Sequence, residues 1–134
     1  MQNVFTTDFP VEWGDCDEAG IVFYPNYFYW LDCTFQRLLR SRGLGQRENQ
    51  AEFGAVTPLV DAGMQFRAPV RYDESIRVEA QIACWEEKRF RIEYRVLSGE
   101  KLIAEGYEVR AWAVLTQGSL RGAPIAEEFK RRMT

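Results

Sequence analysis

The chain has 134 residues, a length typical of one domain, so we expect a single domain over residues 1–134. Apolar residues make up 46% of it, and 20 Asp and Glu residues against 17 Lys and Arg residues give a formal net charge of -3. This composition excludes a disordered chain and a basic nucleic-acid-binding surface, and the apolar runs are too short to span a membrane.

Residues 4–13 alternate between apolar and polar side chains and predict a half-buried strand. A loop over 14–24 follows, and Pro25 marks a helix start, because the missing N–H of proline costs little at the first helical position. The helix continues to about Gly43, a residue type common at helix C-termini. Its apolar positions cover most of the circumference, which predicts burial on several sides: Tyr27, Phe28, Trp30, Leu31, Cys33, Phe35, Leu38 and Leu39.

The rest of the chain predicts antiparallel strands near 60–68, 76–84, 90–96 and 107–115, followed by a short helix at 125–132. We assign Gly106 to a bulge and the apolar face of the last strand to the core; that face carries Tyr107, Val109, Ala111, Ala113 and Leu115. One buried helix followed by such strands predicts an α+β fold in which a curved antiparallel sheet wraps a long central helix. The free edges of one such sheet favour pairing with a second copy.

The chain contains no histidine. Ser-His-Asp and Cys-His catalytic sites and the common His-containing zinc sites are therefore excluded, and we expect no metal. Three cysteines without CxxC spacing and no visible signal peptide predict a reduced, cytoplasmic protein. We interpret Cys16 as a small packing residue, since flanking carboxylates disfavour a thiolate, and Cys33 and Cys84 as core residues.

The segment GDCDEAGIVFYPNYFYWL, residues 14–31, gathers groups suited to acyl transfer. Asp15 and Asp17 supply carboxylates, Gly20 allows close backbone approach to a ligand, and the helix start near Pro25 offers free N–H groups. Such N–H groups stabilise an oxyanion, while a carboxylate attacks a carbonyl or activates water. The alternative is that Asp15 or Asp17 only caps the helix or closes a turn, and their spacing does not separate the two aspartates.

The stretch DCDEAGIVFYPNY, residues 15–27, strongly resembles the signature of hotdog-fold acyl-CoA thioesterases, and it is most similar to the 4-hydroxybenzoyl-CoA thioesterase branch. The resemblance continues through WLD at 30–32, TP at 57–58, the residues from Phe66 to Asp73 and the turn from Trp85 to Phe90. It implies a hotdog fold and an acyl-CoA substrate, with no cofactor beyond the CoA of the substrate. It also implies a homodimer with active sites at the subunit interface, assembling to a homotetramer.

The resemblance also implies roles for residues of the loop. The catalytic nucleophile or general base falls on Asp17, and the oxyanion donor falls on the backbone N–H of Tyr24. The site is further shaped by Gly20, Pro25 and Asn26. Glu18 stands where members of that branch carry proline, and Tyr24 where many relatives acting on aliphatic or carrier-bound acyl groups carry histidine. The second difference favours an aryl acyl group.

Three further sites come partly from the resemblance. It places Lys88 and Arg89 against the phosphates of CoA, with Arg71 as a second candidate, although exposed turn charges are usually only solvated. Thr57 is implied to line the nucleotide groove. Asp32 is acidic within a mostly apolar helix, so it is either an outward-facing or hydrogen-bonded helix residue, or a polar contact for the distal end of the acyl group in a partner's pocket.

Together these features predict hydrolysis of an acyl-CoA thioester to the free acid and CoA, with an aromatic acyl group of the benzoyl or hydroxybenzoyl type. One alternative is a thioesterase for aliphatic acyl-CoA or acyl-carrier-protein esters. Another is a non-catalytic acyl-CoA-binding module, which would have no need of the Asp17 carboxylate. We expect no nucleic-acid or membrane partner, and interpret the four tryptophans as core or interface residues.

Overall fold

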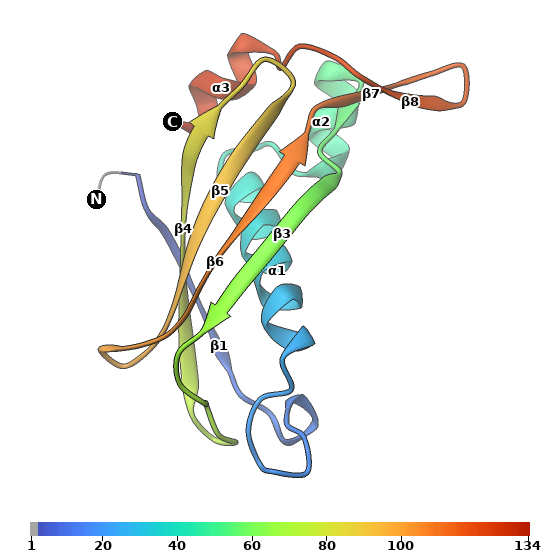
Figure 1. The fold of residues 1–134 in the computed structure, drawn as a ribbon. Coiled ribbons are helices and arrows are strands. Elements are labelled where there is room, and N and C mark those ends of the chain that lie inside the picture. The colour runs from blue at the N-terminus through green and yellow to red at the C-terminus, as the bar shows by residue number, and fades with distance from the viewer. Residues whose placement is uncertain (1–2) are drawn as a thin grey trace.

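A curved antiparallel sheet and one long helix dominate the computed structural model, which describes residues 3–134 (Figure 1). The α+β arrangement predicted from the sequence is therefore confirmed. The strands are β1 (Phe5–Pro10), β2 (Ala55–Val56), β3 (Leu59–Phe66), β4 (Ser75–Trp85), β5 (Arg89–Ser98), β6 (Lys101–Ala111), β7 (Ala113–Thr116) and β8 (Ser119–Gly122). The helices are the 3-10 turn η1 (Trp13–Asp15), α1 (Pro25–Ser41), α2 (Gln46–Phe53) and α3 (Glu127–Met133).

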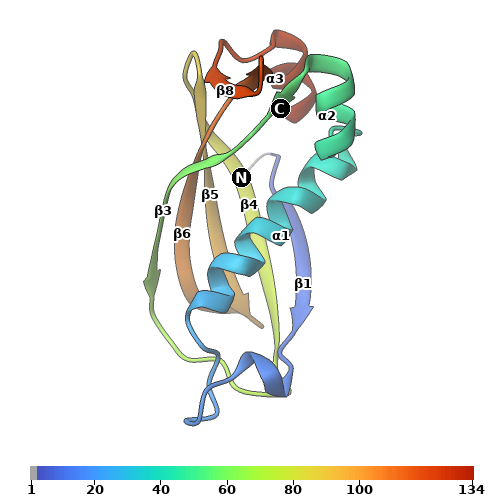
Figure 2. The ribbon, with the colours of Figure 1, turned by 90° about the vertical axis from the view of Figure 1, so that its right-hand side faces the viewer.

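The main sheet has the strand order β1-β4-β5-β6-β3, and every neighbouring pair is antiparallel. Helix α1 lies across one face of this sheet, as the side view in Figure 2 shows. The short strands β2, β7 and β8 form a separate sheet at the end where α1 finishes. Strand β3 is an edge of the main sheet, so its outer side is open to pairing. Within residues 3–134, no helix is both long and apolar enough to cross a membrane.

Helix α1 begins and ends where the sequence indicates. Pro25 occupies its first position, and the next two N–H groups turn back, from Asn26 to the Phe23 carbonyl at 3.0 Å and from Tyr27 to the Tyr24 carbonyl at 3.1 Å. The chain leaves the helix through Gly43, whose φ of +68° suits a residue without a side chain. The buried positions of α1 are Tyr27, Trp30, Leu31, Thr34, Phe35, Leu38 and Leu39.

Two segments differ from the sequence prediction. Helix α2 was not predicted, because its polar sequence QRENQAEF carries no apolar periodicity and buries only Asn49. The last predicted strand, 107–115, is divided at Trp112 between β6 and β7. Within β6 the buried face is also the opposite one, because Glu108 and Arg110 point inward with 2% and 5% of their surface exposed, whereas Ala113 of β7 is buried as predicted. The predicted core face, from Tyr107 to Ala111, is only half-buried.

Two residue assignments were wrong because they depend on neighbouring strands. Gly106 is not at a bulge: it pairs regularly with Tyr94 and with Met64, and a Cβ there would lie 2.8 Å from the Gly63 carbonyl oxygen. Its role is therefore close approach of β3 to β6. Cys84 is exposed and not in the core, because the register shifts between Ile82 and Cys84 and breaks the alternation.

The packing around Gly106 yields a stability prediction. Gly106→Ala should lower the free energy of unfolding by about 1–3 kcal/mol, since the added methyl meets backbone and the Met64 side chain at 2.8 Å. Urea denaturation of this variant beside Gly14→Ala measures the effect, because a Cβ at Gly14 meets nothing within 4 Å. Equal stability of the two variants would contradict this packing account.

Candidate active site

The loop before α1 is a small hairpin that presents Asp17 at its turn. The Asp17 N–H donates to the Ile21 carbonyl at 2.9 Å, and the Gly20 N–H donates to the Asp17 carbonyl at 2.9 Å. Gly20 has a φ of +79°, which favours glycine at the end of this tight turn. The Val22 N–H donates to the Val70 carbonyl at 2.9 Å and ties the hairpin to the main body.

The structure separates the two aspartates that the sequence could not. One carboxylate oxygen of Asp15 accepts the Glu12 N–H at 2.8 Å, and the Asp15 carbonyl accepts the Phe23 N–H at 2.9 Å and the Asn26 side-chain amide at 2.8 Å. Asp15 and Asn26 therefore hold the loop in shape. Asp17 uses one oxygen, Oδ1, to accept the Ala19 N–H at 2.9 Å, as the turn-closing alternative required. Among residues 3–134 no group donates to its second oxygen, so Asp17 keeps an exposed, available carboxylate oxygen.

One backbone N–H at the start of α1 is left free. Pro25 has no N–H, and the N–H groups of Asn26 and Tyr27 are taken by the turn described above. The Tyr24 N–H has no acceptor among the described residues, and it lies where the positive end of the helix dipole is directed. This geometry leaves the Tyr24 N–H as a free backbone donor at the start of α1, directly after the Asp17 loop.

The side chain of Tyr24, the residue that carries this donor, packs against other aromatic rings. Tyr24 is 59% exposed, and its ring lies 5.6 Å from that of Phe23 and 6.3 Å from that of Phe66, centroid to centroid. Burial raises the pKa of the Tyr27 phenol to about 12, so Tyr27 stays neutral here. A hollow of about 400 Å³ opens beside these rings; it is lined by Ile21, Tyr27, Phe66, Arg67, Ala68 and Pro69.

The predicted phosphate contacts lie at the other end of the chain's long axis (Figure 1). The Val11 N–H donates to the Glu74 carbonyl, so the loop region begins beside the start of β4, whereas Lys88 follows the end of β4. Strand β4 has 11 residues, and ten steps of about 3.3 Å put its two ends roughly 33 Å apart. Lys88 and Arg89 are exposed and form no ion pair within residues 3–134. One chain therefore does not bring these residues to Asp17.

Arg71 and Thr57 lie at opposite ends of the main sheet. Thr57 is at the Lys88 end, because the N–H groups of Ala111 and Trp112 donate to the Pro58 and Lys88 carbonyls. Arg71 forms a bridge with Ile21, so it lies at the Asp17 end and not beside Lys88. Thr57 is buried, with 3% of its surface exposed, and its carbonyl accepts a hydrogen bond from Arg110. Its hydroxyl oxygen is buried without a partner among the described residues.

Sequence reasoning missed a buried charged cluster beneath α1. Asp32 Oδ1 accepts from Arg110 Nη2 at 2.8 Å, and Arg110 also pairs with Glu108, whose Oε1 accepts the Tyr94 hydroxyl at 2.6 Å. Burial and the neighbouring Glu108 carboxylate raise the pKa of Tyr94 well above its ordinary value. Burial alone would lower the pKa of Arg110, but Glu108 raises it, so the guanidinium stays charged. The only available signal was the EVR segment at 108–110, whose alternating charged side chains are typical of the solvent-facing side of a strand.

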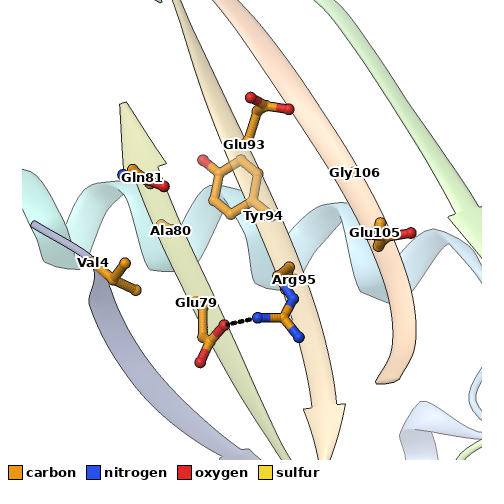
Figure 3. A pocket seen from close by; sticks show the side chains of 9 residues that line it. All are labelled: Val4, Glu79, Ala80, Gln81, Glu93, Tyr94, Arg95, Glu105 and Gly106. Carbon is orange, nitrogen blue, oxygen red and sulfur yellow. Dashed lines mark hydrogen bonds and ion pairs between the residues drawn. The ribbon is translucent and has the colours of Figure 1, made fainter. Parts of the chain in front are cut away.

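A second hollow, of about 190 Å³, lies on the face of the sheet away from α1 (Figure 3). Three carboxylates line it, from Glu79, Glu93 and Glu105, and its Arg95 is already paired with Glu79 at 3.2 Å. Such a surface repels phosphates and contains none of the predicted site residues. Among residues 3–134, no group of three or more Cys, Asp or Glu side chains is placed to hold a metal ion.

Comparison with known proteins decides the family. The model of the thioesterase-like superfamily matches residues 11–133. The chain is 31% identical to a 4-hydroxybenzoyl-CoA thioesterase from Pseudomonas sp. (strain CBS-3), and the match covers 96% of each chain. The chain belongs to the thioesterase-like superfamily. The predicted hotdog family, and hydrolysis of an acyl-CoA thioester as its activity, are therefore confirmed.

Solved structures of two thioesterases superpose closely on this one. An Asp-to-Asn mutant of 4-hydroxybenzoyl-CoA thioesterase, complexed with 4-hydroxybenzoyl-CoA, gives a TM-score of 0.92 at 29% identity, over 98% of this chain and 99% of that one. The gentisyl-coenzyme A thioesterase BH1999 gives a TM-score of 0.81 at 31% identity, over 93% of this chain and 98% of that one. This thioesterase therefore shares its fold over nearly its full length with enzymes named for hydroxylated aryl substrates.

The environment of Cys16 yields a prediction on thiol reactivity. Burial and the charges of Asp15 and Asp17 raise the pKa of the Cys16 thiol, so little thiolate forms near neutral pH. Asp17→Asn removes one of these charges and should lower that pKa, which speeds iodoacetamide labelling of Cys16 at pH 8. Mass spectrometry of labelled peptides checks this, with exposed Cys84 as internal standard and Asp61→Asn as a distant charge control. Unchanged Cys16 labelling in Asp17→Asn would show that Asp17 does not act on the thiol.

Proposed function

We propose that this thioesterase hydrolyses aromatic acyl-CoA esters of the benzoyl or hydroxybenzoyl type, with Asp17 as the catalytic carboxylate and the Tyr24 N–H as the oxyanion donor. The observation that carries the proposal is that the loop over 14–24 contains both a carboxylate oxygen of Asp17 and a backbone N–H of Tyr24 without a hydrogen-bond partner among the described residues. Asp15, by contrast, is engaged in holding the loop. The reaction needs no metal and no cofactor beyond the CoA of the substrate.

The chemistry follows from these two groups. The Asp17 carboxylate attacks the thioester carbonyl carbon, or it takes a proton from a water that attacks instead. In either case the carbonyl oxygen gains negative charge, which the Tyr24 N–H and the start of α1 stabilise. Collapse of the adduct breaks the C–S bond and releases CoA as the thiolate. Direct attack leaves an anhydride on Asp17 that water then cleaves, whereas general-base attack gives the acid at once.

An aromatic acyl group is supported by the surroundings of the free N–H. Tyr24, Phe23 and Phe66 offer exposed ring surface, and aryl groups pack favourably against such rings. The names of the relatives, 4-hydroxybenzoyl-CoA and gentisyl-CoA thioesterases, support the same class. An aliphatic acyl-CoA or acyl-carrier-protein ester is the second candidate, because the hollow beside Tyr27 is apolar and open.

A complete site requires a second copy in this proposal. Strand β3 has a free edge with exposed Leu59, Val60 and Phe66, and two copies paired antiparallel along it bury these residues. Antiparallel pairing sets the Asp17 end of one chain beside the Lys88 end of the other. CoA bound by Lys88 and Arg89 of one copy then delivers its thioester to Asp17 of the second. We propose a homodimer of single-domain chains on this basis, assembling further to a homotetramer.

The catalytic assignment is tested by thiol release from acetyl-, octanoyl-, benzoyl-, 3- and 4-hydroxybenzoyl- and phenylacetyl-CoA. Asp17→Asn should lower kcat on the aryl esters by at least roughly a hundredfold, the usual contribution of a positioned acid or base. Asp15→Asn, with the same charge change two residues away, should retain most activity because asparagine still accepts the Glu12 N–H.

Three other outcomes would redirect the proposal. Equal losses in Asp15→Asn and Asp17→Asn would remove the distinction between the two aspartates. Turnover of the aliphatic esters alone would establish the second candidate substrate class. Tight binding of CoA esters without any turnover would indicate a binding module.

The phosphate contacts yield a separate prediction. The double variant Lys88→Gln/Arg89→Gln should raise KM for benzoyl-CoA roughly tenfold, the typical effect of losing a charge-assisted hydrogen bond, and weaken its salt dependence. The KM for the N-acetylcysteamine thioester of benzoate, which lacks the phosphates, should not change. Lys101→Gln, an exposed lysine in the β5–β6 hairpin, serves as the control. An equal KM increase for both thioesters would place Lys88 and Arg89 outside the phosphate site.

A further inference from the structure

Arg110 makes nearly every hydrogen bond that its side chain can make. Its Nε donates to Glu108 Oε1 at 3.1 Å, its Nη1 to the Thr57 carbonyl at 3.0 Å, and its Nη2 to Asp32 Oδ1 at 2.8 Å and Glu108 Oε2 at 3.1 Å. The guanidinium also lies over the Phe35 ring, 4.3 Å from its centroid. An arginine with five N–H donors in a rigid plane, so engaged, has one orientation.

Glu108 and Tyr94 hold that orientation from below. The two oxygens of the Glu108 carboxylate accept hydrogen bonds from Nε and Nη2 of Arg110, and the Tyr94 hydroxyl donates to the same carboxylate at 2.6 Å. The side chains of Arg110 and Glu108 are 6% and 3% exposed, so water does not compete for these bonds. The buried cluster therefore holds the Asp32 carboxylate in one position through the hydrogen bond from Arg110.

Asp32 is the open end of the cluster. Its side chain is 48% exposed, and its Oδ1 accepts from Arg110 and, at 3.3 Å, from the Gln36 amide. Oδ2 accepts no hydrogen bond from any residue in 3–134. The cluster carries two carboxylates and one guanidinium, so it keeps an excess negative charge at the exposed end. Such an end accepts a hydrogen bond from a hydroxyl and repels a carboxylate.

The cluster lies where a second copy would bring its catalytic loop. Arg110 pairs with Leu59 at one end of β3, and the Tyr24 ring contacts Phe66 at the other end. Antiparallel pairing of two β3 edges sets the Leu59 end of one chain beside the Phe66 end of the other. In such a dimer, Asp32 of one copy faces the Tyr24 N–H of the second copy. The acyl group of a thioester bound at that N–H then extends toward Asp32.

We propose that Arg110 is a positioning residue for substrate specificity: it holds Asp32 with Oδ2 free, so that the acyl pocket selects aryl groups bearing a hydroxyl. This inference rests on the proposed hydrolysis of hydroxybenzoyl-type CoA esters and adds the residue that positions Asp32. Glu108 and Tyr94 act through Arg110. Unsubstituted benzoyl groups lack the donor, and acyl groups ending in a carboxylate meet the excess negative charge.

The test is a double-mutant cycle read as selectivity, the ratio of kcat/KM for 4-hydroxybenzoyl-CoA to that for benzoyl-CoA. Arg110→Lys keeps the charge but cannot bridge Asp32, Glu108 and Thr57 together, so it should lower the ratio roughly tenfold, the effect of one charge-assisted hydrogen bond. Asp32→Ala should lower it at least as much. In the Asp32→Ala background, Arg110→Lys should then change the ratio no further, because its effect passes through Asp32.

Tyr94→Phe should shift the ratio in the same direction without opening a cavity, and it replaces Arg110→Lys in the cycle if the latter does not fold. Arg77→Lys, which alters an exposed ion pair between Arg77 of β4 and Asp8 of β1, is the matched control and should leave the ratio unchanged. Equal losses on both esters, or a ratio change that persists without Asp32, would overturn the positioning role. Wild-type turnover of neither ester would overturn the proposed aryl function and this inference together.

Discussion

Helix α1 buries Leu31, Phe35 and Leu39 completely against the concave face of the sheet, and this packing determines where both ends of the helix lie. Because Pro25 starts the helix and its next two N–H groups fold back on Phe23 and Tyr24, one donor remains at the entrance. The same packing carries Asp32 to the β6 side of the helix, above Arg110. The positions of the free N–H at the start of α1 and of the Asp32 carboxylate therefore both depend on the apolar packing of α1 against the sheet.

A large part of this organisation was predictable from sequence. Some residue types predict local backbone structure directly. These are the proline at the helix start, the glycine with positive φ after the helix end, and the alternating apolar residues of β4 and β5, so these elements were correctly placed. The loop motif also indicated acyl transfer. Its two aspartates could not be separated, since only the three-dimensional turn shows that Asp15 binds Glu12 while Asp17 keeps a free oxygen.

The misplaced features share a cause, which is that their partners are distant in sequence. Glu108 and Arg110 are buried because Asp32 and Tyr94, far along the chain, satisfy them, whereas an isolated strand with those residues is expected to face solvent. Gly106 depends on the approach of β3, and Cys84 on a register shift opposite β5. Local periodicity contains none of this information.

The distance between Asp17 and Lys88 is the strongest constraint on function, because a thioester held by its phosphates at one end of a chain cannot reach the carboxylate at the other. Mixing subunits tests this most directly. Asp17→Asn and Lys88→Gln/Arg89→Gln proteins, each weak alone at low benzoyl-CoA, would be unfolded and refolded together at equal amounts. Half the dimers would then carry one intact site, which predicts recovery to about one quarter of wild-type activity. Activity equal to the average of the two separate variants would contradict a site shared between copies.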